Sequence, residues 1–213
     1  MNSRLPFFDA DSATRLENAR HPYPVVSLFS GAMGLDLGLN EAGLRVAVSQ
    51  DMDKWCIETM RRNSHLAIDG DIRDLIESDP SCEFFLQASG VTREALFAVV
   101  GGPPCQPFST AGKRKGVEDA RGQLYQEFIK VVSALRPRFF IMENVKGLAS
   151  MPCDPADKQS KPVLDTILES FKAIGYHTVH GILDAVHYGT PQFRERLVIV
   201  GSRDGEDVFL PAP

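Results

Sequence analysis

One cysteine stands where an apolar run gives way to a turn. Cys105 follows Gly101-Gly102-Pro103-Pro104, and residues 95–100 before that turn are mostly apolar. The run predicts the end of a buried strand, which the glycines and prolines stop. A thiol on a loop stiffened by prolines on both sides is well placed for nucleophilic catalysis. A single intracellular cysteine is more often an inert buried thiol, so this motif alone leaves both interpretations open.

Polar side chains follow other predicted strands in the same way. Glu143 and Asn144 come after a predicted strand over residues 138–142, which is apolar from Phe139 on. Because the carboxyl ends of parallel strands share one edge of a sheet, Glu143 could face the same pocket as Cys105. A pair of arginines, Arg194 and Arg196, has a spacing of two, so their side chains would point the same way on an extended backbone. The alternative for each of these groups is an ordinary surface charge or cap.

The beginning of the chain has the pattern of a nucleotide-binding α/β fold. An apolar run over residues 25–29 is followed by Ser30, Gly31 and Gly34 and then by a helical pattern up to Gly43. Strand, glycine turn and helix open such folds because small residues let a ligand approach the backbone. An ordinary strand–helix turn has the same signature.

A carboxylate follows the second predicted strand, over residues 44–49. Asp51 could accept both hydroxyl groups of a ribose from this position. Asp53 is better suited to cap a helix over residues 54–63. Capping is also the alternative role for Asp51.

Taken together, these stretches resemble the cytosine-5 DNA methyltransferases. The motifs occur in the order of that family: Leu28-Phe29-Ser30-Gly31 with Gly34, Gly70-Asp71-Ile72, Gly101-Gly102-Pro103-Pro104-Cys105-Gln106-Pro107-Phe108-Ser109, Glu143-Asn144-Val145 and Gln192-Phe193-Arg194-Glu195-Arg196. Each short motif is weak alone, but five in one order are a specific signal. The resemblance implies an α/β, Rossmann-like S-adenosylmethionine-dependent methyltransferase fold. Such a fold has a mostly parallel sheet, helices on both faces and an antiparallel closing strand.

The resemblance also implies roles for individual residues. Cys105 would attack a flipped cytosine and Glu143 would bind its Watson–Crick edge, while Arg194 and Arg196 would contact the base and the DNA backbone. The implied S-adenosylmethionine site comprises Phe29, Ser30, Gly31, Gly34, Asp51, Met52, Asp71, Ile72 and Leu124. The implied substrate contacts are Pro104, Gln106, Ser109 and Asn144.

Two positions depart from the family pattern. The family usually has aspartate where this chain has Ser27, and glycine where it has Met33. Met33 adds a side chain to a turn that we expect to be crowded, which leaves the affinity for the cofactor open.

Composition bounds the class of protein. The 213 residues are 43% hydrophobic and 24% charged, which is enough for one domain with a full core. No apolar run approaches the roughly 18 residues of a membrane span, and no leader sequence opens the chain. The four cysteines are scattered without metal-ligand spacing, which predicts reduced thiols in a cytoplasmic protein without a metal. The net charge of −5 is unusual for a duplex-binding protein, so a basic DNA-binding face is either local or elsewhere.

The order of motifs predicts an N-terminal extension (1–23), a catalytic domain (24–203) and a tail (204–213) that leads to an absent target-recognition region. We expect a second chain to carry that region and a C-terminal helix. Double-stranded DNA would be the substrate, within a restriction–modification system. The alternatives are a truncated or non-catalytic regulatory subunit and a tRNA cytosine-5 methyltransferase.

Overall fold

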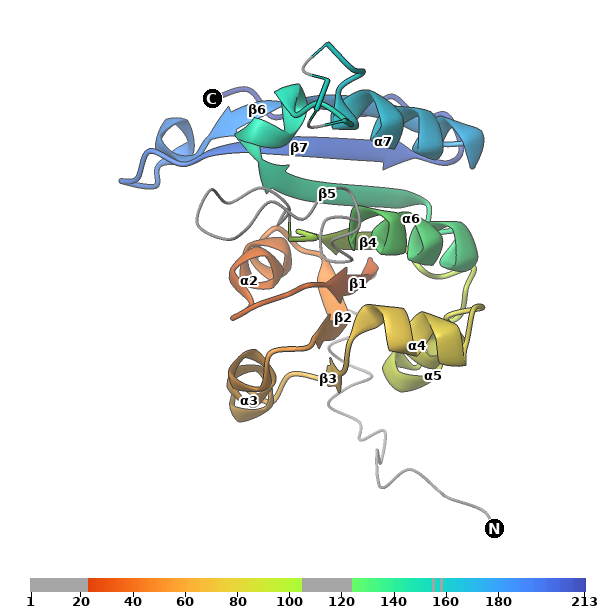
Figure 1. The fold of residues 1–213 in the computed structure, drawn as a ribbon. Helices are drawn as coiled ribbons and strands as arrows, with labels where there is room; N and C mark the ends of the chain where they lie inside the picture. Colours follow the sequence, from red (N-terminus) through yellow and green to blue (C-terminus); the bar gives the residue numbers. More distant parts are fainter. Residues whose placement is uncertain (1–22, 105–123, 155, 158) are drawn as a thin grey trace.

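The computed structural model describes residues 23–104, 124–154, 156, 157 and 159–213. Its centre is a seven-stranded sheet with the strand order β3-β2-β1-β4-β5-β7-β6 (Figure 1). The strands are β1 (Pro24–Leu28), β2 (Arg45–Asp51), β3 (Ala67–Asp69), β4 (Ala98–Gly101), β5 (Phe139–Val145), β6 (His177–Asp184) and β7 (Glu195–Ser202). Neighbouring strands are parallel except at β7, which is antiparallel to both β5 and β6.

Helices cover both faces of this sheet. The α-helices are α2 (Gly34–Glu41), α3 (Lys54–Arg62), α4 (Ile72–Ser78), α5 (Glu83–Ser89), α6 (Leu124–Leu135) and α7 (Val163–Ala173), and two 3₁₀ helices are η1 (Lys146–Ser150) and η2 (Ala185–Tyr188). Helices α2 and α3 lie on one face, and α4 to α7 lie on the other (Figure 1). The expected α/β fold is therefore confirmed. The antiparallel strand β7 lies inside the sheet, however, and β6 closes it at the edge.

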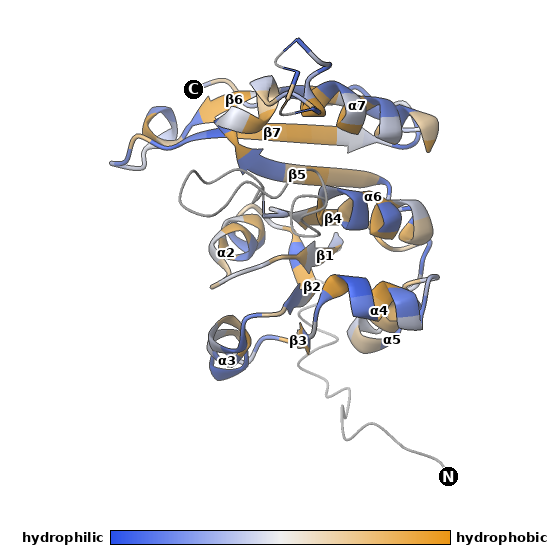
Figure 2. Cartoon of the chain, viewed as in Figure 1, coloured by the Kyte–Doolittle hydropathy of each residue, from blue (hydrophilic) through white to orange (hydrophobic). Residues whose placement is uncertain are grey.

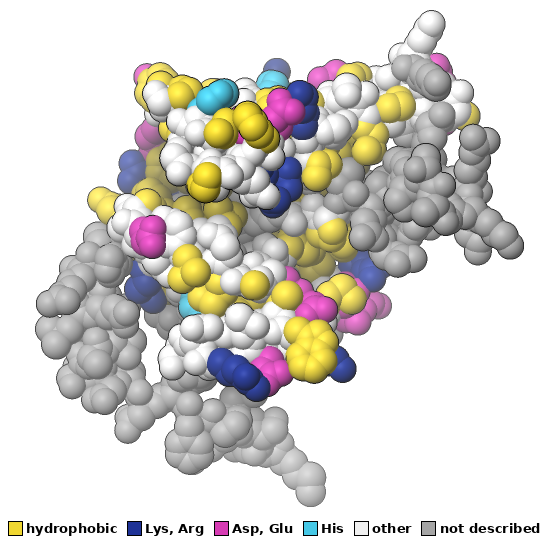
Figure 3. Space-filling view, turned by 90° about the vertical axis from the view of Figure 1, so that its left-hand side faces the viewer, with side chains coloured by type: hydrophobic (Ala, Val, Ile, Leu, Met, Phe, Trp, Pro, Cys, Tyr) yellow, Lys and Arg dark blue, Asp and Glu magenta, His cyan; other side chains and the backbone are white. Residues whose placement is uncertain are grey.

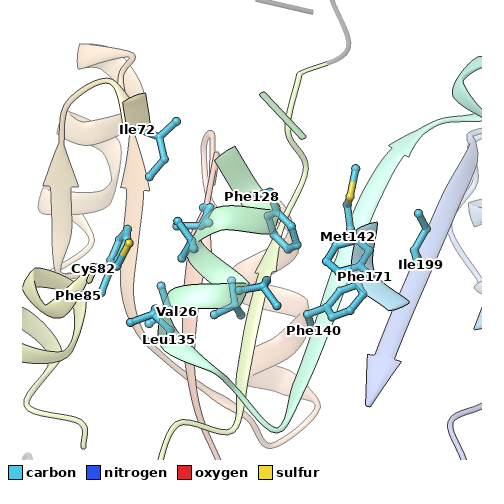
Figure 4. Close-up of a cluster of buried hydrophobic side chains, with 14 of the residues drawn as sticks. Val26, Ile72, Cys82, Phe85, Phe128, Leu135, Phe140, Met142, Phe171 and Ile199 are labelled. Atoms are coloured by element: carbon cyan, nitrogen blue, oxygen red, sulfur yellow. The ribbon is translucent and has the colours of Figure 1, made fainter. Parts of the chain in front are cut away.

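The larger core lies between the sheet and helices α4 to α7 (Figure 4). The rings of Phe140 in β5 and Phe171 in α7 stack with centroids 3.9 Å apart, and Phe128 of α6 meets both rings edge-on. Hydrophobic residues concentrate in the strands, clearly along β7 (Figure 2). All residues of β1 and β4 are buried, as expected for central parallel strands that helices cover on both sides.

The face opposite that core is only partly covered beyond β4. Ile141 of β5 and Val198 and Val200 of β7 are half-buried side chains on this face. The C-terminal tail contributes one contact there, because Leu210 lies against Gly181 of β6. No α-helix of the described residues packs over this part of the sheet (Figure 1). None of the described helices is long and apolar enough to cross a membrane.

Two aspartates show how local hydrogen bonds set helix starts. The carboxylate of Asp53 accepts from the backbone N–H groups of Trp55 and Cys56, which confirms the predicted cap of α3. Asp71, in the motif Gly70-Asp71-Ile72, is also a helix cap and not part of a strand. Strand β3 ends at Asp69, and Asp71 caps α4 because its carboxylate accepts from the N–H of Arg73. A short polar side chain there competes with continued strand pairing.

Candidate active site at the carboxyl edge of the sheet

A pocket of about 210 Å³ lies where strands β1, β2 and β4 end. Its wall consists of Phe29, Gln50, Asp51, Met52, Asp71, Ile72, Gly102, Pro104 and Leu124. Seven of these nine residues are among the site residues predicted from the sequence. The structure brings them together from segments up to about a hundred residues apart, because parallel strands place their carboxyl ends side by side.

The turn after β1 is tied to the end of β2. The N–H of Gly31 donates to Oδ2 of Asp51 at 2.8 Å, and the N–H of Ser30 donates to the carbonyl oxygen of Gln50 at 3.1 Å. Oδ1 of Asp51 accepts from the N–H of Asp53 at 2.8 Å. Each carboxylate oxygen has a second lone pair, so Asp51 can still accept bonds from a ligand.

Met33 corrects one expectation about this turn. A Cβ atom built at Gly31 or Gly34 meets nothing within 4 Å, so the turn is not crowded there. Met33 has a positive φ of 70°, and its side chain packs with Ile57 and Met60 of α3. Met33 and Gly34 are not part of the pocket wall. Backbone strain at Met33 is therefore offset by burial on α3.

Asp71 and Ile72 lie in the pocket wall, and Asp71 already has a charged partner. Arg73 donates from Nη2 to Oδ2 of Asp71 at 2.5 Å, and this bond holds the pKa of the Asp71 carboxyl below its ordinary value. The salt bridge and the cap of α4 both fix the direction of the carboxylate. Ile72 is almost fully buried beside it.

Gln50 is a site residue that the sequence analysis missed. Its side chain is 1% exposed, and Nε2 donates to the carbonyl oxygen of Gly70 at 2.7 Å, which joins β2 to the turn after β3. The available signal was a polar residue near the end of an otherwise apolar strand. Such a residue, when buried, must bond to something nearby.

Glu143 and Arg196, both predicted to be catalytic, form an ion pair. Oε1 of Glu143 lies 2.8 Å from Nε of Arg196, and both side chains are about one third exposed or less. The pairing of β5 with β7 places Arg196 opposite Val145, two residues beyond Glu143 on the same face. A Cβ atom at Gly102 would lie 3.0 Å from Oε2 of Glu143. Glycine at position 102 therefore leaves the space that the carboxylate uses.

Asn144 holds the loop that leads to Cys105. Its Nδ2 donates to the carbonyl oxygen of Pro103 at 2.9 Å, and its Oδ1 accepts from the N–H of Val145. Asn144 is 5% exposed, so both groups of its amide are engaged inside the protein. Arg194 is exposed, and its backbone N–H donates to Asp184. The structure therefore brings Arg196, but not the side chain of Arg194, to Glu143.

The predicted nucleophile follows directly on the described part of this loop. Pro104 lines the pocket, and Cys105 is the next residue. Cys105, Gln106 and Ser109 lie outside the described residues, so their predicted roles stay predictions.

Comparison with known proteins confirms the family resemblance. The family model for C-5 cytosine-specific DNA methylases matches residues 23–212. The type II methyltransferase M.AquIA of Picosynechococcus is 40% identical over 89% of this chain and 75% of its own length. M.NgoFVII of Neisseria gonorrhoeae is 35% identical over 94% of this chain but only 50% of its own length. The chain thus spans three quarters of one curated relative and about half of others.

Solved structures share the fold. A protein described as a prophage-encoded DNA modification methyltransferase of E. coli is 27% identical, with a TM-score of 0.66, over 85% of this chain and 47% of its own. The S. pombe Dnmt2 methyltransferase, at 23% identity and a TM-score of 0.64, shares the fold over 88% of this chain and 53% of its own. The chain belongs to the C-5 cytosine-specific DNA methylase family.

Proposed function

We propose that this chain is the catalytic part of a DNA cytosine-5 methyltransferase that uses S-adenosylmethionine as the methyl donor. The observation that carries the proposal is the Glu143–Arg196 ion pair beside Gly102. The predicted nucleophile, Cys105, comes three residues after Gly102 in the sequence. Gly102 itself lies in the wall of the nucleoside-sized pocket. A carboxylate, a guanidinium and the residues that lead to the predicted nucleophile thus lie at one edge of the sheet.

The pocket residues fit a nucleoside sulfonium. Asp51 offers carboxylate lone pairs to ribose hydroxyls, and Phe29 and Ile72 offer apolar surface to a base. A volume of about 210 Å³ is below the roughly 300–1,000 Å³ of typical ligand pockets, so we assign it to the adenosine end of the cofactor. S-adenosylmethionine would supply an electrophilic methyl group beside the cytosine.

The protein's own groups make the cytosine reactive. The Cys105 thiolate adds to carbon 6 of the flipped base, while Glu143 keeps a proton on ring nitrogen 3. Electron density moves to carbon 5, which would take the methyl group as the sulfonium leaves as neutral S-adenosylhomocysteine. Loss of the carbon-5 proton to solvent and departure of the thiolate from carbon 6 then restore the aromatic ring. Arg196 orients Glu143, and Asn144 orients the loop through Pro103.

Covalent trapping tests this function. The chain is mixed with S-adenosylmethionine and DNA that carries a cytosine analogue unable to release the thiol, and a denaturant-resistant complex is measured. We expect trapping by the wild type and by Cys153→Ala, which removes an exposed cysteine, but none by Cys105→Ala. Trapping by the Cys105→Ala variant would show that another group is the nucleophile. Parallel reactions with tRNA distinguish the tRNA-directed alternative.

We also propose that a second polypeptide supplies the sequence-reading region within a restriction–modification system. Two observations support it: the net charge of −5 and the sheet face beyond β4 that no described α-helix covers. The half-buried Ile141, Val198 and Val200 offer that polypeptide an apolar surface.

A further inference from the structure

A buried carboxylate lies behind the pocket and takes no part in the reaction described above. Asp36, in the first turn of α2, is 0% exposed. It faces Ser27 of β1 and Ser49 of β2, which are direct neighbours in the pairing of these two strands. Both hydroxyl groups donate to Asp36 at 2.6 Å, one to each carboxylate oxygen.

With Asp36 ionised, the hydrogen bonds of this cluster run in one direction. An ionised carboxylate only accepts, so the hydroxyls of Ser27 and Ser49 must each donate their single proton to Asp36. Ser27 then accepts from the hydroxyl of Ser30 at 2.8 Å, and Ser49 accepts from Nε2–H of His65 at 2.7 Å. Every donor points toward the carboxylate, and the cluster is complete without a bound ligand.

The charge of Asp36 has favourable surroundings without a basic partner in the described part of the chain. Two hydroxyl donors and the first turn of α2 both stabilise an anion. Burying a carboxylate still costs more free energy than burying the apolar side chains that fill the rest of the sheet. Packing alone therefore does not explain why three polar residues meet at positions 27, 36 and 49.

Ser30 connects this cluster to the turn over residues 29–31, which lies beside the pocket. Ser30 lies between Phe29, which lines the pocket, and Gly31, which bonds to Asp51. Its hydroxyl donates to the hydroxyl oxygen of Ser27, and its backbone N–H donates to the carbonyl oxygen of Gln50. A change at Asp36 would alter the orientation of the Ser27 hydroxyl that accepts from Ser30, and it would substitute no residue of the pocket wall.

We propose that Asp36 is a positioning residue for the S-adenosylmethionine site, acting through Ser27 and Ser30 on the turn over residues 29–31. Ser27 stands where the family pattern has aspartate, and in this chain its hydroxyl donates to the carboxylate of Asp36. The proposal rests on the proposed function, because it assigns the pocket to that cofactor.

Calorimetric binding of S-adenosylhomocysteine to the whole chain tests the proposal. We expect Asp36→Asn and Ser27→Ala each to weaken binding about tenfold, because the first removes the charge and one of the two acceptors that order these hydroxyl groups, and the second removes the acceptor of Ser30. The exchange variant, with Ser27→Asp and Asp36→Ser together, should bind within about threefold of the wild type. Asp165→Asn, an exposed carboxylate in the first turn of α7, is the matched control and should bind as the wild type does.

Thermal unfolding of the same samples separates positioning from stability. A variant that unfolds earlier but binds within twofold of the wild type would overturn the proposal, as would a folded exchange variant that binds no better than Asp36→Asn. If Asp36→Asn does not fold, Ser27→Ala and Ser30→Ala decide by the same criteria. In a methyl-transfer assay with DNA as the acceptor, a positioning role predicts that these variants have a raised KM for the methyl donor and an unchanged kcat. A wild-type chain that binds no S-adenosylhomocysteine would contradict the proposed function itself.

Discussion

At the scale of single residues, Glu143 has a fixed position and remains partly exposed, so that it can contact a nucleobase. Its carboxylate is held by Arg196 and fits against the backbone of Gly102. Glu143→Gln keeps the shape but loses the charge that would hold a proton on cytosine. We expect methyl transfer to slow by roughly a hundredfold or more, as is typical for loss of an acid–base group. Binding of S-adenosylhomocysteine, measured by calorimetry, should change by less than about twofold.

The control for this substitution is an ion pair at the other end of the same strand. Glu206 pairs with Arg138, next to the start of β5. Glu206→Gln removes a carboxylate of comparable exposure without touching the site, so transfer should be unaffected. Equal losses of transfer and cofactor binding in Glu143→Gln would contradict the role in protonating the ring.

His65 gives the stability a pH dependence with a definite sign. Burial lowers its pKa below 6.5, and the charge of Asp36 opposes this only in part. The unfolded chain therefore binds the proton more readily than the folded chain. The free energy of unfolding should fall as the pH is lowered from about 6.5 through the folded-state pKa, with no contribution from His65 above that range.

Urea unfolding at pH 7.5, 6.5 and 5.5 measures this effect. His65→Gln can still donate to Ser49 but cannot titrate, so its loss of stability between pH 6.5 and 5.5 should be smaller than that of the wild type. An identical pH profile for wild type and His65→Gln would show that burial does not shift this histidine.

At the scale of elements, one glycine permits the contact between β7 and β5. A Cβ atom at Gly201 would collide with the ring of Phe140, which stacks on Phe171 in the core. Gly201→Ala should destabilise the protein by about 1–3 kcal/mol or more through overpacking. Gly38→Ala, inside α2 with nothing within 4 Å, should instead stabilise by about 0.5–1 kcal/mol. Denaturant unfolding of both variants measures the contrast, and similar changes in the two would contradict it.

The elements could largely be predicted from the sequence because their signals are local. Apolar runs broken by glycine or proline marked the strands, so the run over residues 95–100 corresponds to β4 (Ala98–Gly101) with a shifted boundary. The motifs likewise placed most of the pocket wall. Contacts between distant residues had no such signal. Ser27 with Asp36 and Gly102 with Glu143 depend on how elements pack, and that information is not contained in any short stretch.

At the scale of the whole molecule, the charge distribution bears on DNA binding. On the side that carries α2 and α3, basic and acidic side chains of the described residues are interspersed with hydrophobic ones (Figure 3). Exposed Leu37 and Trp55 belong to these helices. We expect the isolated chain, with its net charge of −5, to bind duplex DNA weakly and with little sequence preference.

Fluorescence anisotropy with several duplexes, at two salt concentrations, measures that binding. Affinity should fall with added salt by a similar factor for every sequence, since phosphate contacts carry no sequence information. Tight binding that selects one sequence would contradict the proposal that another polypeptide reads the DNA.

The interior position of β7 has a consequence for the order of assembly during synthesis. Strand β6 leaves the ribosome before β7, yet its only partner among the described strands is β7. The nascent chain therefore carries β6 as an unpaired segment until β7 inserts between it and β5. Because Arg196 arrives on β7, the guanidinium that holds Glu143 is added after every residue of the pocket wall. A chain stalled before β7 would have most of the cofactor pocket but an unrestrained Glu143.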